Sequence, residues 1–201
     1  MRSYGLCFLS PVLLLVLMWV IRGLEWFVPG GLTHLGLTSW RPASLAGVVA
    51  SPLLHADWPH LLANSAPFLI LGCLVTTAGV ARFWIVTAVG ALASGLAAFI
   101  LNPPGVTTVG ASGLIFAYFA YLLLAGFYAP DWPRRIGLWA VALLVFGAYG
   151  ASLFAGLVPG TAGVSWQGHL GGACGGLVCA RLPAGSRAAG RRTPPQSGLE
   201  M

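Results

Sequence analysis

Charge is scarce in this sequence. Only 7% of its 201 residues are Asp, Glu, Lys or Arg, whereas a soluble domain carries roughly 25%. All ten basic residues are arginine, and the only carboxylates are Glu25, Asp57, Asp131 and Glu200. A chain that is 58% hydrophobic with so few charges cannot cover a water-facing surface, so we expect lipid to surround most of it.

Signatures of several other classes are missing as well. The four cysteines form no CxxC pair and lie inside apolar runs, where cysteine behaves as a small hydrophobe: Cys7, Cys73, Cys174 and Cys179. We therefore expect no disulfide framework, no metal site and no cofactor. The net charge is +6, but the arginines lie between or beyond the apolar runs and form no basic face interleaved with aromatic residues, which argues against a nucleic-acid partner.

What is present is a series of six apolar runs, each near the length of about 20 residues that a membrane-crossing helix needs. The sequence predicts an all-α, polytopic membrane bundle of six helices within one domain, residues 1–182, with spans at about 6–27, 58–78, 81–100, 112–129, 136–157 and 166–182. Proline and glycine interrupt the apolar segment 28–57, so we expect short helices at the membrane interface there. The Gly-, Arg-, Pro- and Ser-rich residues 183–201 predict a disordered polar tail.

Arginine placement predicts the orientation of the bundle. If the N-terminus is cytoplasmic, eight arginines fall on the cytoplasmic side and only Arg22 and Arg41 fall toward the outside, as the positive-inside rule requires. Both termini are then cytoplasmic. The arginine-only, Ala- and Gly-rich usage is typical of a GC-rich bacterial genome, for which the plasma membrane is the expected location.

A few polar side chains lie at the mouths of the predicted spans. Intramembrane polar groups are costly and are therefore functional candidates. His60 and Asn64 share one face of span two, because residues i and i+4 align on a helix. Ser112 opens span four, and His169 lies one turn into span six. Spans two, four and six all begin at the outer side, so these four residues are expected at a similar depth, with His55 just outside.

Ser112 stands in the run Gly110-Ala111-Ser112-Gly113. One interpretation is a helix N-cap, a position that serine favours. The other is a nucleophile, because the first N–H groups of a helix have no intrahelical partner and are available to an oxyanion beside the serine hydroxyl.

His169 precedes a glycine pattern. Gly168, Gly172 and Gly176 recur every four residues and predict one smooth helix face, which Gly171 and Gly175 widen. Such faces let membrane helices approach closely. Helix packing alone explains the glycines, whereas a catalytic interpretation also explains the imidazole, which close packing would bring within reach of a serine on a neighbouring helix.

Span two begins with Asp57 and Pro59, which predict a helix start with Asp57 as the N-cap. His60 and Asn64 then have two possible roles. They either join helices through hydrogen bonds, worth about 0.6 kcal/mol on average in membranes, or donate to a developing oxyanion, worth roughly 3–4 kcal/mol for one good donor.

Together these residues resemble the rhomboid family of intramembrane serine proteases. The matching elements are His60-x-x-x-Asn64, Gly110-x-Ser112-Gly113 and His169-x-x-Gly172-x-x-x-Gly176, and the resemblance covers about residues 6–182. His55 also matches a commonly seen rhomboid histidine. Two features depart from the usual pattern: Phe116 stands where many members have tyrosine, and Trp40-Arg41 lie earlier than the usual Trp-Arg pair.

The resemblance implies a serine endopeptidase that cleaves single-span membrane proteins near their outer end. Ser112 would be the nucleophile and His169 the base, while His60, Asn64 and the Ser112 amide would hold the oxyanion. Gly110, Gly113, Phe116, Gly172, Gly176 and His55 would support the site. The resemblance also implies that the 28–57 loop and span five act as gating elements.

Two alternatives remain open from the sequence. A non-proteolytic rhomboid-like adaptor is the first, although inactive relatives usually lose the serine or histidine that this chain retains. A small channel or transporter is the second, in which His55, His60 and His169 line a path or form a three-nitrogen metal site. The natural substrate and the oligomeric state do not follow from the sequence.

Overall fold

The computed structural model describes residues 8–129, 131–155, 157–159 and 163–182, and these are almost entirely helical. The α-helices among them are α2 (Leu9–Leu24), α3 (Gly47–Ala50), α4 (Trp58–Thr76), α5 (Val80–Leu101), α6 (Ser112–Tyr128), α7 (Trp132–Ala155) and α8 (Trp166–Arg181). The purely all-α prediction needs one correction, because β1 (Leu37–Thr38) pairs antiparallel with β2 (Thr107–Thr108). The predicted tail, residues 183–201, lies outside the described residues.

Three of the described helical stretches are long and apolar enough to cross a membrane: Leu9–Phe27, Trp58–Thr76 and Val80–Leu101. Two further apolar stretches, Ser112–Tyr128 and Arg135–Tyr149, are shorter. The helix bounds lie close to the six ranges expected from the sequence. Six crossings and the orientation of the termini stay predictions.

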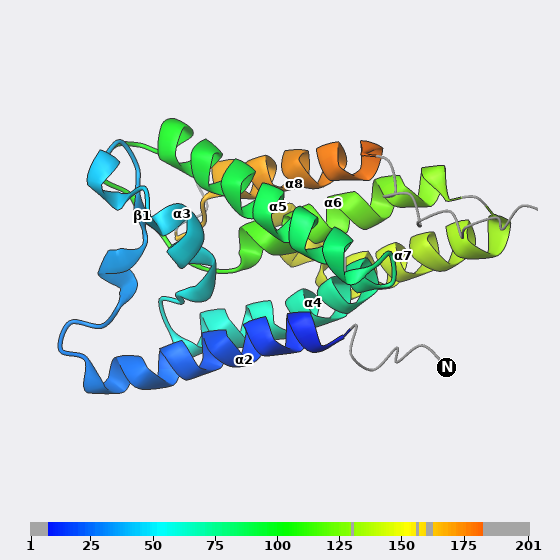
Figure 1. Ribbon diagram of the computed structural model, residues 1–201. Helices are drawn as coiled ribbons and strands as arrows, with labels where there is room; N and C mark the ends of the chain where they lie inside the picture. Colours follow the sequence, from blue (N-terminus) through cyan, green and yellow to red (C-terminus); the bar gives the residue numbers. More distant parts are fainter. Residues whose placement is uncertain (1–7, 130, 156, 160–162, 183–201) are drawn as a thin grey trace, which may run out of the picture.

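The 28–57 segment folds into short pieces at one end of the bundle, at the left of Figure 1, where β1 and α3 lie. Besides these two elements it contains single 3₁₀ turns at Thr33–Leu35, Pro42–Ser44 and Ser51–Leu53, following another at Glu25–Phe27. Proline and glycine help to keep these elements short, because neither continues a helix well: Pro42 and Pro52 lie at the starts of two turns, and Gly36 follows a third. The strand pairing with β2 was not expected, since it joins residues about seventy positions apart.

The start of α4 follows from its local sequence. The Asp57 carboxylate accepts a hydrogen bond from the His60 backbone N–H at 2.7 Å, which confirms Asp57 as the N-cap. Pro59 sits in the first turn, where its missing N–H costs nothing. These two residues fix where the helix begins, and therefore the depth of His60 and Asn64.

Glycine faces let α8 pack against both α5 and α6. A Cβ atom at Gly172 or Gly176 would overlap the backbone carbonyl of Gly113 or Ala117 in α6. A Cβ at Gly171 would instead overlap α5 at Ala93. The glycines thus form two faces toward two helices, and not the single widened face that the four-residue repeat predicted.

The interior between α4, α5 and α6 is aromatic. Tyr118 is fully buried and packs against Phe68 and Phe83 with ring centroids 5.6 and 5.7 Å apart. Its hydroxyl shares a 2.8 Å hydrogen bond with Thr87, so the buried polar group is satisfied. This cluster joins α4, α5 and α6 beneath the site.

Candidate active site

The structure brings Ser112 and His169 into contact. Ser112 Oγ and His169 Nε2 are 2.7 Å apart, a normal hydrogen-bond distance. His169 is 9% exposed and Ser112 is partly buried. The pair lies at the beginnings of α6 and α8, at the end of the bundle where α3 and β1 gather (Figure 1).

Ser112 is not the N-cap of α6. The capping position belongs to Ala111, and no side chain caps this helix end. Ser112 is the first helical residue, so its own N–H and that of Gly113 lack intrahelical acceptors. The N-cap interpretation was therefore wrong, and the hydroxyl is directed to the imidazole instead.

Close helix packing sets the distance between the two side chains. Gly172 lies directly against the Gly113 carbonyl, one residue after Ser112. Gly113 in turn lies against the Ser94 side chain of α5, and a Cβ there would overlap the Ser94 hydroxyl. A methyl group at Gly172 would push α6 and α8 apart and lengthen the serine–histidine contact, whereas one at Gly113 would press on Ser94 and push α6 away from α5.

Phe116 stacks on the imidazole of His169. Their ring centroids are 4.5 Å apart and their planes differ by 14°. Phe116 lies one turn after Ser112 on the same face of α6, so one helix carries both the hydroxyl and the ring that orients its partner. The phenyl ring fixes the plane of the imidazole by packing alone.

His60 and Asn64 lie beside the backbone that leads into Ser112. An added Cβ at Gly110 would come within 2.7 Å of His60 Nε2 and 3.6 Å of Asn64 Nδ2. Gly110 has φ +116°, which side chains rarely tolerate, and its N–H donates to the Ser51 carbonyl at 2.8 Å. Glycine is therefore required here twice, for its conformation and for the space it leaves to the imidazole.

Asn64 carries an unused donor. It is 7% exposed, and its Nδ2 is buried without a hydrogen-bond partner among the described residues. An unpaired buried amide group costs about 1–3 kcal/mol. This donor lies near Gly110, two residues before Ser112, and can donate to a partner that the described chain does not provide.

His55 lies behind this group, in the loop before α4. It is 1% exposed, and its ring meets that of His60 edge-on at 5.1 Å. Burial, followed by the nearby His60, lowers the pKa of His55 to about 4. His55 is therefore neutral at physiological pH. Its uncharged ring packs against the ring of His60.

The three-nitrogen metal site considered from the sequence is not assembled. His55 and His60 are neighbours, but His169 lies with Ser112 and Phe116. Throughout the described part of the chain, no three side chains among His, Cys, Asp and Glu come together as a metal-binding group.

Sequence reasoning missed a second layer of polar residues. Asn102 ends α5 and is 3% exposed, and it accepts a 3.0 Å hydrogen bond from the Ser165 hydroxyl. Ser165 is the N-cap of α8 and accepts from the Gly168 N–H at 3.2 Å. A serine just before an apolar run is an N-cap signal that would have identified Ser165. Nothing local marks Asn102 beyond a helix end before proline.

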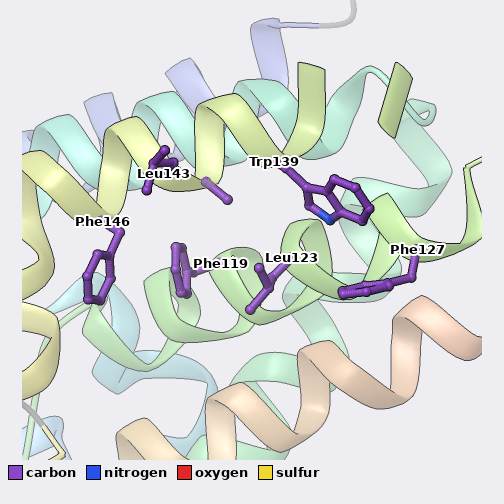
Figure 2. Close-up of a pocket in the computed structure, with 7 residues that line it drawn as sticks. Phe119, Leu123, Phe127, Trp139, Leu143 and Phe146 are labelled. Atoms are coloured by element: carbon purple, nitrogen blue, oxygen red, sulfur yellow. The ribbon is translucent and has the colours of Figure 1, made fainter. Parts of the chain in front are cut away.

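An apolar cavity of about 580 Å³ separates α6 from α7. Figure 2 shows aromatic and aliphatic side chains of the two helices facing it, and its lining comprises Phe119, Leu123, Phe127, Trp139, Ala142, Leu143 and Phe146. Among the described residues α7 packs mainly against α6. This helix is thus held less tightly than α8, which lies between two neighbours.

Comparison with known proteins identifies one family and several relatives. The family model of the rhomboid domain matches residues 39–184. An uncharacterized protein of Mycobacterium tuberculosis is 44% identical over 154 residues, which cover 73% of this chain and 62% of that protein. One of Mycobacterium leprae is 35% identical over 176 residues, covering 84% and 68%. A Bacillus subtilis protein named a putative rhomboid protease is 30% identical over 132 residues, covering 65% and 63%. The chain thus spans less than two thirds of the Mycobacterium tuberculosis relative.

Proposed function

Because the chain belongs to the rhomboid family, we propose that it is an intramembrane serine endopeptidase that cleaves single-span membrane proteins near their outer end. The observation that carries this proposal is the 2.7 Å contact between Ser112 Oγ and His169 Nε2. The contact lies near one end of a bundle whose helices include three that are long and apolar enough to cross a membrane. An adaptor needs no such contact. The proposed orientation places both termini in the cytoplasm and the site near the outer surface.

In the proposed reaction Ser112 Oγ attacks the carbonyl carbon of the scissile peptide bond, and His169 Nε2 accepts the hydroxyl proton. The resulting oxyanion receives hydrogen bonds from the Ser112 N–H, from Asn64 Nδ2 and from His60. His169 then returns the proton to the leaving amine as the C–N bond breaks. Water, deprotonated by His169, hydrolyses the acyl-enzyme and restores the serine.

Two features support the oxyanion role of α4. Asn64 Nδ2 is buried without a partner, and both Asn64 and His60 lie against Gly110, two residues before the nucleophile. The positive end of the α6 dipole adds to these donors, because Ser112 is the first residue of that helix. Preorganised donors of this kind supply roughly 3–4 kcal/mol each to transition-state binding.

A membrane-embedded substrate must reach this site from the side. The proposed entrance involves α7, because a cavity of about 580 Å³ between α6 and α7 leaves that helix with few constraints. The short turns of the 28–57 segment lie at the same end of the bundle as the Ser112–His169 pair and are proposed as the second element that moves.

The test uses the purified protein in detergent with a model single-span substrate. Ser112→Ala and His169→Ala should each lower cleavage by at least about 10³-fold, as for other serine–histidine pairs. Matched controls are Ser65→Ala, a membrane-helix serine that bonds the Leu61 carbonyl, and His34→Ala, an exposed loop histidine. Both controls should retain activity.

Two further measurements separate the candidate functions. A fluorophosphonate probe should label the wild type and not Ser112→Ala, and a chelator should leave cleavage unchanged. Cleavage that survives Ser112→Ala refutes the nucleophile, and a folded wild type that neither cleaves nor labels favours the adaptor.

A further inference from the structure

We propose that Asn102 is a positioning residue that sets the distance between Ser112 and His169, by linking the two segments of chain that lead into them. The proposal rests on the proposed function, since it assigns the geometry of the same pair. Asn102 touches neither reacting atom and acts only through its neighbours.

The side chain of Asn102 makes two hydrogen bonds in opposite directions. Its Nδ2 donates to Thr108 Oγ1 at 3.0 Å, and its Oδ1 accepts from Ser165 Oγ at 3.0 Å. Thr108 lies in β2, four residues before Ser112, and Ser165 lies four residues before His169. One amide therefore joins the approach to the nucleophile to the approach to the base.

The link continues from Ser165 into α8. Ser165 Oγ accepts from the Gly168 N–H at 3.2 Å, and the Ser165 carbonyl accepts from the His169 N–H at 3.1 Å. Gln167 reinforces this start of the helix by donating to the Leu101 carbonyl at 3.3 Å. The first turn of α8, which carries His169, is thereby tied to the end of α5.

On the other side, β2 holds the approach to Ser112. It pairs with β1, and the backbone carbonyl of Asn102 itself accepts from Trp40 Nε1 at 3.1 Å. Because Asn102 is 3% exposed, water does not compete for these bonds. Asn102 is therefore the residue at which the 28–57 segment, β2 and the start of α8 meet.

The proposed proton transfer from Ser112 to His169 requires an accurate distance between the two side chains. A misplacement of about 1 Å in a reacting group costs on the order of 10²-fold in rate. Losing the Asn102 link frees the starts of α6 and α8 to shift relative to each other, while the substrate-binding surfaces stay in place. The rate of the chemical step should therefore fall with little change in substrate binding.

The decisive variants are Asn102→Leu, which keeps the volume and removes both bonds, and Thr108→Val, which removes one. The matched control is Thr107→Val, because the Thr107 hydroxyl pairs with that of Thr38 at 2.9 Å on the same strand pair without touching Asn102. Fluorophosphonate labelling rate, kcat, KM and thermal stability are measured for each in detergent.

We expect Asn102→Leu to lower kcat and the labelling rate by about 10- to 100-fold with KM within about twofold, and Thr108→Val to show part of that loss. Ser165→Ala should act in the same way, and Ser165→Thr should restore the rate because it keeps the hydroxyl. Thr107→Val should change only stability. Equal rate losses in Thr107→Val and Thr108→Val, or wild-type labelling by folded Asn102→Leu, would overturn the proposal.

One readout does not depend on activity. With ¹⁵N-labelled histidine, Ser112→Ala should shift the His169 ring resonance in the wild-type background and shift it much less when Asn102→Leu is already present. If the wild type neither cleaves nor labels, the proposed function fails, and this measurement still decides whether Asn102 sets the contact. If Ser112→Ala shifts the His169 ring resonance as much in the Asn102→Leu background as in the wild type, the positioning role of Asn102 is refuted. If Asn102→Leu does not fold, Thr108→Val and Ser165→Ala take its place in both measurements.

Discussion

Buried His55 should make the fold sensitive to acid. Its pKa lies at about 4 in the folded protein and at 6.5 in an exposed histidine. Between these values the unfolded chain binds more protons than the folded chain, so stability rises with pH. The contribution is complete above pH 6.5 and is lost progressively as the pH falls through 6.5 toward 4.

The size of the effect follows from the shift. Lowering the pKa from 6.5 to about 4 corresponds to roughly 3 kcal/mol, most of which is lost between pH 7.5 and 4.5. Burial is the largest cause, and the titratable or charged groups that act on His55 are His60, Arg22 and Asp57. Arg22 also contacts the loop directly, since its Nη1 donates to the His55 carbonyl at 3.4 Å.

The assay compares the free energy of unfolding in detergent at pH 7.5 and pH 4.5 for the wild type, His55→Gln and His34→Gln. His55→Gln removes the titrating ring, so its loss of stability on acidification should be smaller than that of the wild type by roughly 2–3 kcal/mol. His34 is exposed, so His34→Gln serves as the control. Its free energy of unfolding should fall between pH 7.5 and pH 4.5 by the same amount as that of the wild type. Equal pH dependence in the wild type and His55→Gln would refute the reasoning, because His55 would then not be buried as a neutral ring.

Three further substitutions test the packing and the donors of the site. Gly172→Ala places a methyl group on the Gly113 carbonyl and should cost about 1–3 kcal/mol of stability together with most of the activity, whereas Gly137→Ala, which meets open space, should be neutral in thermal unfolding and cleavage assays. Asn64→Leu removes the unpaired donor and should lower kcat by about 10²–10³-fold without lowering stability, so a destabilised Asn64→Leu with normal kcat would contradict the oxyanion role. Arg82→Gln removes a guanidinium that donates to the last carbonyls of α8 at 3.0 and 3.3 Å, and should lower the unfolding temperature more than kcat.

Much of the fold was predictable because its signals are local. Apolar runs, proline interruptions and the Asp57 cap placed the helices near their observed bounds. The β1–β2 pairing was not predictable, because it joins two-residue strands whose partners lie far apart in the sequence. The burial of His55 was equally hidden, since it depends on how the end of the 28–57 segment packs against the helices, and no local sequence signal marks that packing.

Much of the candidate site followed from counting spans. Alternate spans begin on the same side, so Ser112, His169, His60 and Asn64 were expected at one depth, and the structure brings Ser112 to His169 and both α4 residues to Gly110. Distances, ring planes and hydrogen-bond partners depend on side-chain packing between helices and had to come from the structure. Asn102 illustrates the limit, because its importance lies in bonds to two residues distant in sequence.

The division of the glycines in α8 between two neighbours has a consequence for the site. Five of its 16 residues are glycine, and each costs about 1 kcal/mol relative to alanine in a helix. Such a segment has little tendency to be helical alone, so its helix is held by close contact with α5 and α6, by the Ser165 cap and by Arg82. The imidazole is therefore carried by an element whose order depends on its neighbours, and any change that separates α8 from α6 should reduce catalysis before it unfolds the bundle.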